Sequence, residues 1–317
     1  MHQLRHTIFF LVLFVFLFTN ASFGDNYIHI AVLKSDNLVS TKRAISGAKS
    51  IVQRKYNNAI LHEFLISQSS NSDKEIIDTI NSHNPTLILT IGTNATSFAK
   101  EHFKKIPIVF SSVRYPVLSG IVKSMDKPGG NITGASLNIP NNVQFRTFVD
   151  IVPDIQNIGV LYSDYTKDLI TSAAKTAKKM GLNLIAIPVN QPKDLPSAVD
   201  SLTRSCQGIW SVADPRLFNS QSTRYILLNS IRKGIPFMGF SRHVVESGAL
   251  FALDLDHKGV GRQAGEIIDQ IIGGEKPSNI PVSMVDLIWF HYNEKTASHI
   301  DILIPDKYLA VAKEVYR

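Results

Sequence analysis

An internal repeat constrains the fold of this chain more than any other feature of its sequence. The segment Ile30–Asp36 reads IAVLKSD, and Ile158–Asp164, which starts 128 residues later, reads IGVLYSD. The segment Ile106–Phe110 is similar in the same way to Ile235–Phe240, which starts 129 residues later. Two matches at nearly equal offsets make chance a poor explanation. The repeat therefore predicts two halves with one architecture.

Both halves alternate short apolar runs with amphipathic stretches in the same order. The expected helices and strands are, in order, 41–55, 59–66, 73–82 and 87–91 in the first half and 167–180, 183–189, 194–203 and 208–212 in the second. Strands that alternate with helices indicate right-handed βαβ units and a parallel sheet in each half. We therefore predict an α/β protein of two similar Rossmann-like lobes, joined by hinge strands, with a cleft between them.

The chain beyond Gly248 does not continue the repeat and is too short for a third lobe. We expect its strands and helices, including a last helix over Pro305–Tyr316, to cross between the two lobes. The predicted limits are 25–135 plus 250–280 for lobe one and 136–249 plus 281–317 for lobe two.

The first 24 residues are typical of a cleaved secretory signal. A basic residue, Arg5, precedes the apolar run Ile8–Phe18, and the small residues Ser22 and Gly24 precede the expected cut before Asp25. Eleven apolar residues fall short of the roughly 20 that span a bilayer. Since no cysteine lies near the cut, we expect a periplasmic protein with no lipid anchor there.

Composition excludes several classes of protein. The net charge is +7, but lysine and arginine are scattered along the expected helices, so we expect no nucleic-acid partner. The one cysteine, Cys206, excludes an internal disulfide and is interpreted as a packing residue. The ten histidines are dispersed, and no catalytic or phosphate-loop motif is present. We therefore expect no metal, no cofactor and no enzyme activity.

Polar side chains follow the expected strands of both halves. Ligands of open α/β sheets sit beyond the carboxyl ends of the strands, so these residues are the candidate ligand-binding set. They are Ser35, Thr93, Asn94, Ser111, Ser112 and Tyr115 in the first half and Ser163, Tyr165, Asp214 and Ser241 in the second. Thr93 or Asn94 can also cap the helix that follows Gly92, and the free N–H groups of that helix favour a carboxylate.

Some of these candidates have a second interpretation. Asp214 precedes Pro215, a pairing typical of the N-cap and first position of a helix, so it could cap a helix, bind a ligand or do both. Tyr115 and Tyr165 could enclose an aromatic or alkyl group, or they could simply be exposed at the rim of the cleft.

Several motifs resemble a known family. They are Ile106–Phe110 with Tyr115–Val117, Pro128–Gly134, Ile158–Tyr162, Gly248–Leu250, Gly261 with Ile272–Gly274, Asn293 with Ala297, and Ile302–Pro305. On these residues the chain resembles the ABC transporter substrate-binding proteins of the tryptophan/tyrosine-binding type, which have the type I periplasmic binding protein fold. The resemblance covers nearly all of the chain after the signal.

The resemblance implies a monomer that closes over a small-molecule ligand, often an amino acid, and presents it to an ABC transporter permease in the inner membrane. It also implies that Asp214 lies near a ligand amine. Two positions depart from the family: Tyr115 replaces an acid, and Ser163–Thr166 replaces an asparagine-containing turn. Both positions lie at the expected rim of the cleft, so we expect the departures to affect the ligand and not the fold. Two other functions remain open, a periplasmic ligand-sensing subunit of a signalling system and an exported hydrolase.

Overall fold

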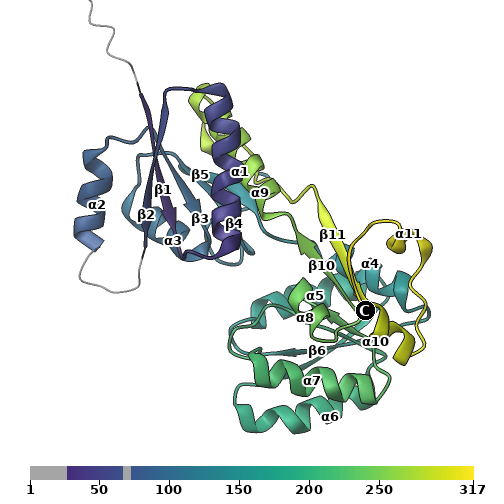
Figure 1. Cartoon of the computed structure of the whole chain (residues 1–317). Coiled ribbons are helices and arrows are strands. Elements are labelled where there is room, and N and C mark those ends of the chain that lie inside the picture. The colour runs from purple at the N-terminus through teal and green to yellow at the C-terminus, as the bar shows by residue number, and fades with distance from the viewer. Residues whose placement is uncertain (1–26, 67–72) are drawn as a thin grey trace, which may run out of the picture.

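The computed structural model describes residues 27–66 and 73–317, so the expected signal segment lies outside the described residues. The described chain forms two α/β lobes, each built on its own sheet (Figure 1). It passes between the lobes within 137–140, at 256 and within 285–287. The predicted two-lobe α/β fold is therefore confirmed.

Lobe one contains a five-stranded parallel sheet in the order β2-β1-β3-β4-β5. Its strands are β1 (Ile28–Lys34), β2 (Ala59–Leu65), β3 (Leu87–Ile91), β4 (Ile108–Val113) and β5 (Ile132–Ser136). Its helices are α1 (Val39–Lys55), α2 (Asp73–Ser82), α3 (Thr93–His102) and α9 (His257–Ile272). Every residue of the central strand β3 is buried, as its continuous apolar run predicts.

Helices cover both faces of this sheet, because alternate residues of a strand point to opposite sides. Leu87 and Leu89 of β3 join the core shared with α1 and α9, whereas Ile88 joins the core shared with α3. Helices α1 and α9 lie side by side (Figure 1) and approach closely at Gly47 and Gly261.

Lobe two contains a seven-stranded sheet in the order β12-β11-β10-β9-β8-β6-β7, which is parallel except for the β10–β11 pair. Its strands are β6 (Asn157–Tyr162), β7 (Asn183–Pro188), β8 (Gly208–Trp210), β9 (Phe237–Gly239), β10 (Phe251–Leu255), β11 (Ile288–Asn293) and β12 (Ala312–Tyr316). Its helices are α4 (Asn141–Ile151), α5 (Lys167–Lys179), α6 (Leu195–Ser205), α7 (Ser220–Arg232), α8 (Arg242–Glu246), α10 (Glu294–His299) and α11 (Asp306–Leu309).

An aromatic cluster forms the centre of lobe two. Trp210 packs edge-on against Phe145, and Phe148 packs edge-on against Phe251, with ring centroids 5.1 and 5.3 Å apart. The indole N–H of Trp210 donates to Oε1 of Gln144 over 2.8 Å. The buried indole is thereby satisfied, as an aromatic residue with a polar atom requires in a core.

The sheet orders explain the repeat. Strands β7-β6-β8-β9-β10 of lobe two follow the same order as β2-β1-β3-β4-β5 of lobe one, and the repeated segments Ile30–Asp36 and Ile158–Asp164 contain the matching strands β1 and β6. Strand β10 is thus the counterpart of β5.

Two details of the C-terminal segment differ from the sequence prediction. The sequence predicts that 250–280 belongs to lobe one, but its first strand, β10, pairs within the sheet of lobe two, whereas α9 and the segment that ends at Ile280 pack on lobe one. The helix expected over Pro305–Tyr316 is a single turn, α11, followed by strand β12. This strand pairs with β11, and that long-range pairing outweighs the local preference for helix.

Candidate functional site

The carboxyl ends of β1, β3 and β4 bring Ser35, Gly92 and Ser111 together in lobe one. The Gly92 N–H donates to the Ser111 carbonyl over 3.0 Å, and the Ser35 N–H donates to the Ile91 carbonyl over 3.2 Å. The Ser35 hydroxyl accepts the N–H of Ala95 over 3.0 Å. Ser35 therefore satisfies an N–H group in the first turn of α3 and fixes the start of this helix against β1.

The prediction that Thr93 or Asn94 caps α3 is wrong. Gly92 is the N-cap residue, at a φ of 88°, and Thr93 is already helical. A residue with a side chain is strained at this φ, and its Cβ would lie 2.9 Å from Oγ of Ser35. Thr93 and Asn94 thus lie in the first turn of α3, beside the end of β4.

The segment after β4 carries backbone strain and buried hydroxyl groups without partners. Ser112 and Tyr115 have φ values of 61° and 50°, in the left-handed region that residues with side chains seldom adopt. The pairing of β4 with β5 is irregular between Ser111 and Val113. Within the described chain, the hydroxyl groups of Ser111 and Ser112 are buried and make no hydrogen bond. Strain and unpaired polar groups of this kind cluster at ligand sites.

Tyr115 is half-buried and its position is fixed by the backbone. Its N–H donates to Oδ1 of Asn138, in the segment that crosses to lobe two, over 2.9 Å. Burial raises the pKa of the Tyr115 phenol, and the nearby charge of Arg114 only partly opposes this. Tyr115 therefore presents a neutral ring and hydroxyl at the point where the lobes join.

In lobe two, Asp214 is the centre of a buried hydrogen-bond network. The side chain is 1% exposed. Its carboxylate accepts from the Ser163 N–H (2.9 Å) and hydroxyl (2.8 Å), the Thr166 hydroxyl (2.6 Å), and the N–H groups of Arg216 (3.0 Å) and Leu217 (3.3 Å). Asp214 thus ties the loop after β6 to the loop after β8.

The network keeps Asp214 ionised. Burial alone would raise the pKa of its carboxyl, but hydrogen bonds from Thr166, Ser163 and Arg216 outweigh this and hold the pKa below its usual value. In this conformation the carboxylate is occupied by protein donors, which favours a positioning role over direct contact with a ligand.

The remaining two candidates lie at the surface of lobe two. Tyr165 is 61% exposed, and the Arg216 guanidinium carbon lies 5.8 Å from the centre of its ring. Ser241 is the N-cap residue of α8, but its side chain makes no capping hydrogen bond. Ser163, Asp214 and Tyr165 therefore come together around the ends of β6 and β8, and Ser241 follows β9 along the same sheet.

A small cavity of about 40 Å³ lies where the chain crosses between the lobes, and we call it the crossing cavity. Residues from both lobes and from the crossing segments line it, among them Arg114 and Tyr115, Ser211 and Phe240, and Leu137, Asp254 and His257. Tyr115 is the one sequence-predicted site residue in its lining. Sequence reasoning missed Asp254 because it did not recognise β10 as the counterpart of β5, and it missed His257 because α9 lies beyond the repeat.

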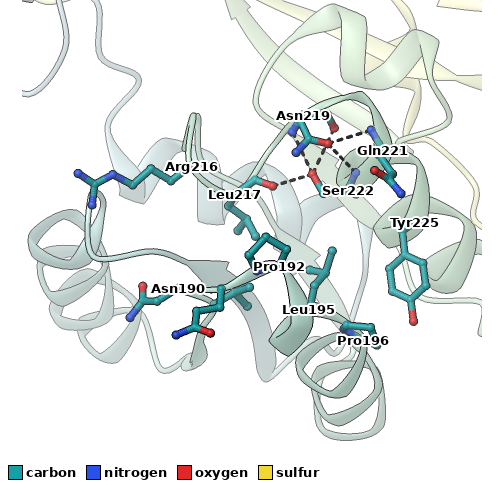
Figure 2. Close-up of a pocket in the computed structure, with 12 residues that line it drawn as sticks. Asn190, Pro192, Leu195, Pro196, Arg216, Leu217, Asn219, Gln221, Ser222 and Tyr225 are labelled. Atoms are coloured by element: carbon teal, nitrogen blue, oxygen red, sulfur yellow. Dashed lines mark hydrogen bonds between the residues drawn. The ribbon is translucent and has the colours of Figure 1, made fainter.

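A second hollow, of about 260 Å³, lies on lobe two outside this cavity. Figure 2 shows Arg216 and Tyr225 at its two ends, with Pro192, Leu195 and Pro196 between them. No residue of the sequence-predicted site lines it.

Three histidines that sequence analysis treated as dispersed stack together in lobe one. Nδ1 of His29 lies 3.0 Å from Nε2 of His62, whose ring centroid is 4.0 Å from that of His83. The neighbouring strands β1 and β2 bring His29 and His62 together, and His83 lies just after α2, so spacing along the sequence does not reveal the contact. Across residues 27–66 and 73–317, no group of three or more His, Cys, Asp or Glu side chains is arranged to hold a metal ion.

Comparison with known proteins identifies the family. Residues 30–316 match the family of ABC transporter substrate binding proteins. The chain belongs to this family. The family and fold predictions from the sequence are thereby confirmed.

Individual relatives of this substrate-binding protein agree with that assignment. A tyrosine-binding protein of Clostridioides difficile is 27% identical over 219 residues, and the match covers 68% of this chain and 63% of the relative. The fold of this chain is similar to that of the ABC domain from Streptococcus pneumonia in complex with L-Trp. The TM-score is 0.69 and the identity 22%, over 91% of this chain and 99% of that one.

A third similar protein is a substrate-binding protein with adhesive properties from Clostridium difficile, solved in a ligand-free, open form. Its TM-score is 0.79 at 20% identity, again over 91% of this chain and 99% of that one.

In the part of this chain that the structure describes, no helix is both long and apolar enough to cross a membrane.

Proposed function

We propose that this chain is an exported solute-binding protein that captures an amino acid or a related small solute between its lobes and delivers it to an ABC transporter permease in the inner membrane. The observation that carries the proposal is the crossing cavity, which residues of both lobes line. A ligand there can contact both lobes at once only when they are close together. It would therefore shift the molecule toward a closed form by its differential affinity for that form.

In this proposal the lobe-one surface receives the polar end of the ligand. The free hydroxyl groups of Ser111 and Ser112 lie beside the first turn of α3, which begins with Thr93 and Asn94. Backbone N–H groups and hydroxyl groups at this surface can donate hydrogen bonds to oxygen atoms of the ligand. Ser35 holds the start of α3 in place.

The lobe-two surface would close over the rest of the ligand. Tyr165 is exposed and Tyr115 is half-buried, so their rings can cover an aromatic or alkyl group at low entropic cost. Ser241 would supply a hydroxyl group from this side. The Ser163 hydroxyl is buried, donates to Asp214 and accepts the Tyr165 N–H, so Ser163 would hold Tyr165 in place. Asp214 would position Ser163 and Thr166 and would not contact the ligand amine itself.

Capture of a solute is a binding equilibrium, so the proposal includes no catalysis and no cofactor. The proposed location is the periplasm, after removal of residues 1–24, and the proposed working unit is a monomer. Two relatives with tryptophan or tyrosine in their names support an amino acid as the first ligand to test.

A thermal-shift screen tests this function. Amino acids, nucleosides and short peptides are added to the purified protein, residues 25–317, and the melting temperature is recorded. A ligand at 100 times its dissociation constant should stabilise the folded protein by about 2.7 kcal/mol, which corresponds to a shift on the order of 5 °C.

The proposal expects at least one amino acid to produce this shift and to be recovered unmodified by mass spectrometry. A shift from another solute class alone would contradict the amino-acid ligand. Conversion of the bound solute into a product would contradict a pure binding function and favour a hydrolase.

A further inference from the structure

The charged residues of the crossing cavity carry an inference that rests on the proposed function. We infer that Arg114, Asp254 and His257 form a recognition floor that binds the carboxylate and the ammonium group of one ligand. Arg114 comes from the loop after β4 in lobe one, Asp254 from β10 in lobe two, and His257 from the start of α9. One ligand that contacts all three therefore couples both lobes and the segment between them.

The His257 ring points to a missing partner. Its Nδ1 atom is buried and makes no hydrogen bond within the described chain. A buried polar atom without a partner costs free energy, and a polar ligand in the cavity would supply the partner. The ring lines the same cavity as Arg114 and Asp254, so the ligand atom that pairs with His257 lies within their reach.

The two charged residues offer complementary contacts. The Arg114 side chain is exposed, and among the described residues it forms no ion pair, so its planar guanidinium is free to bind a carboxylate in two-point fashion. Asp254 is half-buried, and within the described residues its two oxygens accept only the N–H groups of Arg242 (3.2 Å) and Leu255 (2.7 Å). Further acceptor sites on this carboxylate remain for an ammonium group.

The surroundings keep His257 neutral, so that it acts as a hydrogen-bonding group beside the two charges. Burial lowers the pKa of His257. The charges of Arg114 and Arg43 lower it further, whereas those of Asp254 and Asp256 oppose the shift. The pKa therefore lies below the usual histidine value, and at neutral pH the floor carries one positive group and one negative group next to a neutral ring. This pattern matches a zwitterion better than a sugar or a nucleoside.

Three probes separate the two charges of the ligand. L-tyrosine carries both charged groups, tyramine lacks the carboxylate, and 3-(4-hydroxyphenyl)propionate lacks the ammonium group. Calorimetry should show that wild-type protein binds tyrosine at least about tenfold more tightly than either analogue, since each analogue leaves one charged partner unpaired.

Two variants then assign each charge to its residue. Arg114→Gln should weaken tyrosine binding by about tenfold or more and leave tyramine binding nearly unchanged. Asp254→Asn should weaken tyrosine binding by a similar factor and leave binding of the propionate nearly unchanged. Arg232→Gln, an equal charge change on an exposed residue of α7, should change none of the three affinities. Equal weakening of all three probes by either floor variant would overturn the inference.

A ligand-free measurement separates this inference from the proposed function. NMR titration of His257 should show a higher pKa in Arg114→Gln, which removes a cation, and a lower pKa in Asp254→Asn, which removes an anion. Failure of every amino acid in the thermal-shift screen to bind wild-type protein would contradict the amino-acid function. An unchanged His257 pKa in both variants would overturn the floor itself, whatever the ligand.

Discussion

Replacing Asp214 with alanine should lower the free energy of unfolding by roughly 3 kcal/mol or more in the absence of any ligand. The carboxylate is almost fully buried and accepts hydrogen bonds from Ser163, Thr166, Arg216 and Leu217. Hydrogen bonds to a charged group contribute about 1.5–3 kcal/mol each, and their loss leaves buried donors unpaired. The loops after β6 and β8 would then separate.

Urea unfolding measures this loss, with Asp168→Ala as the control. Asp168 is an exposed acid on α5 of the same lobe, and its removal should change stability by no more than about 0.5 kcal/mol. Because the pKa of Asp214 is lowered in the folded protein, its stabilisation is present above the unfolded-state pKa of about 3.9 and is lost as pH falls through the folded-state value. Unchanged unliganded stability with complete loss of ligand binding would instead make Asp214 a ligand contact.

Replacing Gly261 with alanine should destabilise lobe one by about 3 kcal/mol. A Cβ atom at this position of α9 would lie 2.0 Å from the carbonyl oxygen of Ala44 in α1. Backbone cannot move aside as a flexible side chain can, so the two helices must separate, and overpacking of this kind typically costs 1–3 kcal/mol or more. The contact between α1 and α9 also holds in place the segment that follows the lobe crossing at Asp256. Its loss should therefore lower the affinity for the ligand as well.

Gly259→Ala provides a control within the same helix. There the new Cβ would lie 3.0 Å from Oδ2 of Asp256 and 3.3 Å from Nη2 of Arg262, both at the ends of side chains that can shift. Thermal and urea unfolding should show a change within about 1 kcal/mol for Gly259→Ala and the full loss for Gly261→Ala. Equal behaviour of the two variants would contradict the close approach of α1 and α9.

The fold was predictable because its main determinants are local and repeated. The apolar run at Leu87–Ile91 indicates a buried strand. The match between Ile30–Asp36 and Ile158–Asp164 indicates that the same topology occurs twice in the chain. The sequence prediction placed β10 in the wrong lobe and took strand β12 for part of a helix, because both strands are fixed by pairing with β11 and not by local sequence.

The location of the candidate residues at strand ends was predictable, but their contacts were not. The rule that ligands sit beyond strand ends led to Ser35, Ser111 and Asp214, and the structure places all three at such ends. The rule could not show that Ser35 and Asp214 form hydrogen bonds with protein groups while the Ser111 hydroxyl stays unpaired in the described chain. Those differences arise from contacts between separate loops. His257 was missed for the same reason, since only the folded crossing brings it to the cavity.

The central claim is that the two lobes close on a solute, and the distance between them tests it most directly. Fluorescent labels at Lys42→Cys in lobe one and Lys193→Cys in lobe two replace one exposed side chain in each lobe. The native Cys206 should stay unlabelled, because it is buried and burial raises the pKa of its thiol to about 11.

Energy transfer between the two labels is then recorded as the ligand from the thermal-shift screen is added. We expect the transfer efficiency to rise and saturate, with a midpoint at a ligand concentration equal to the dissociation constant from calorimetry. A ligand that binds fully while the transfer efficiency stays constant would contradict it.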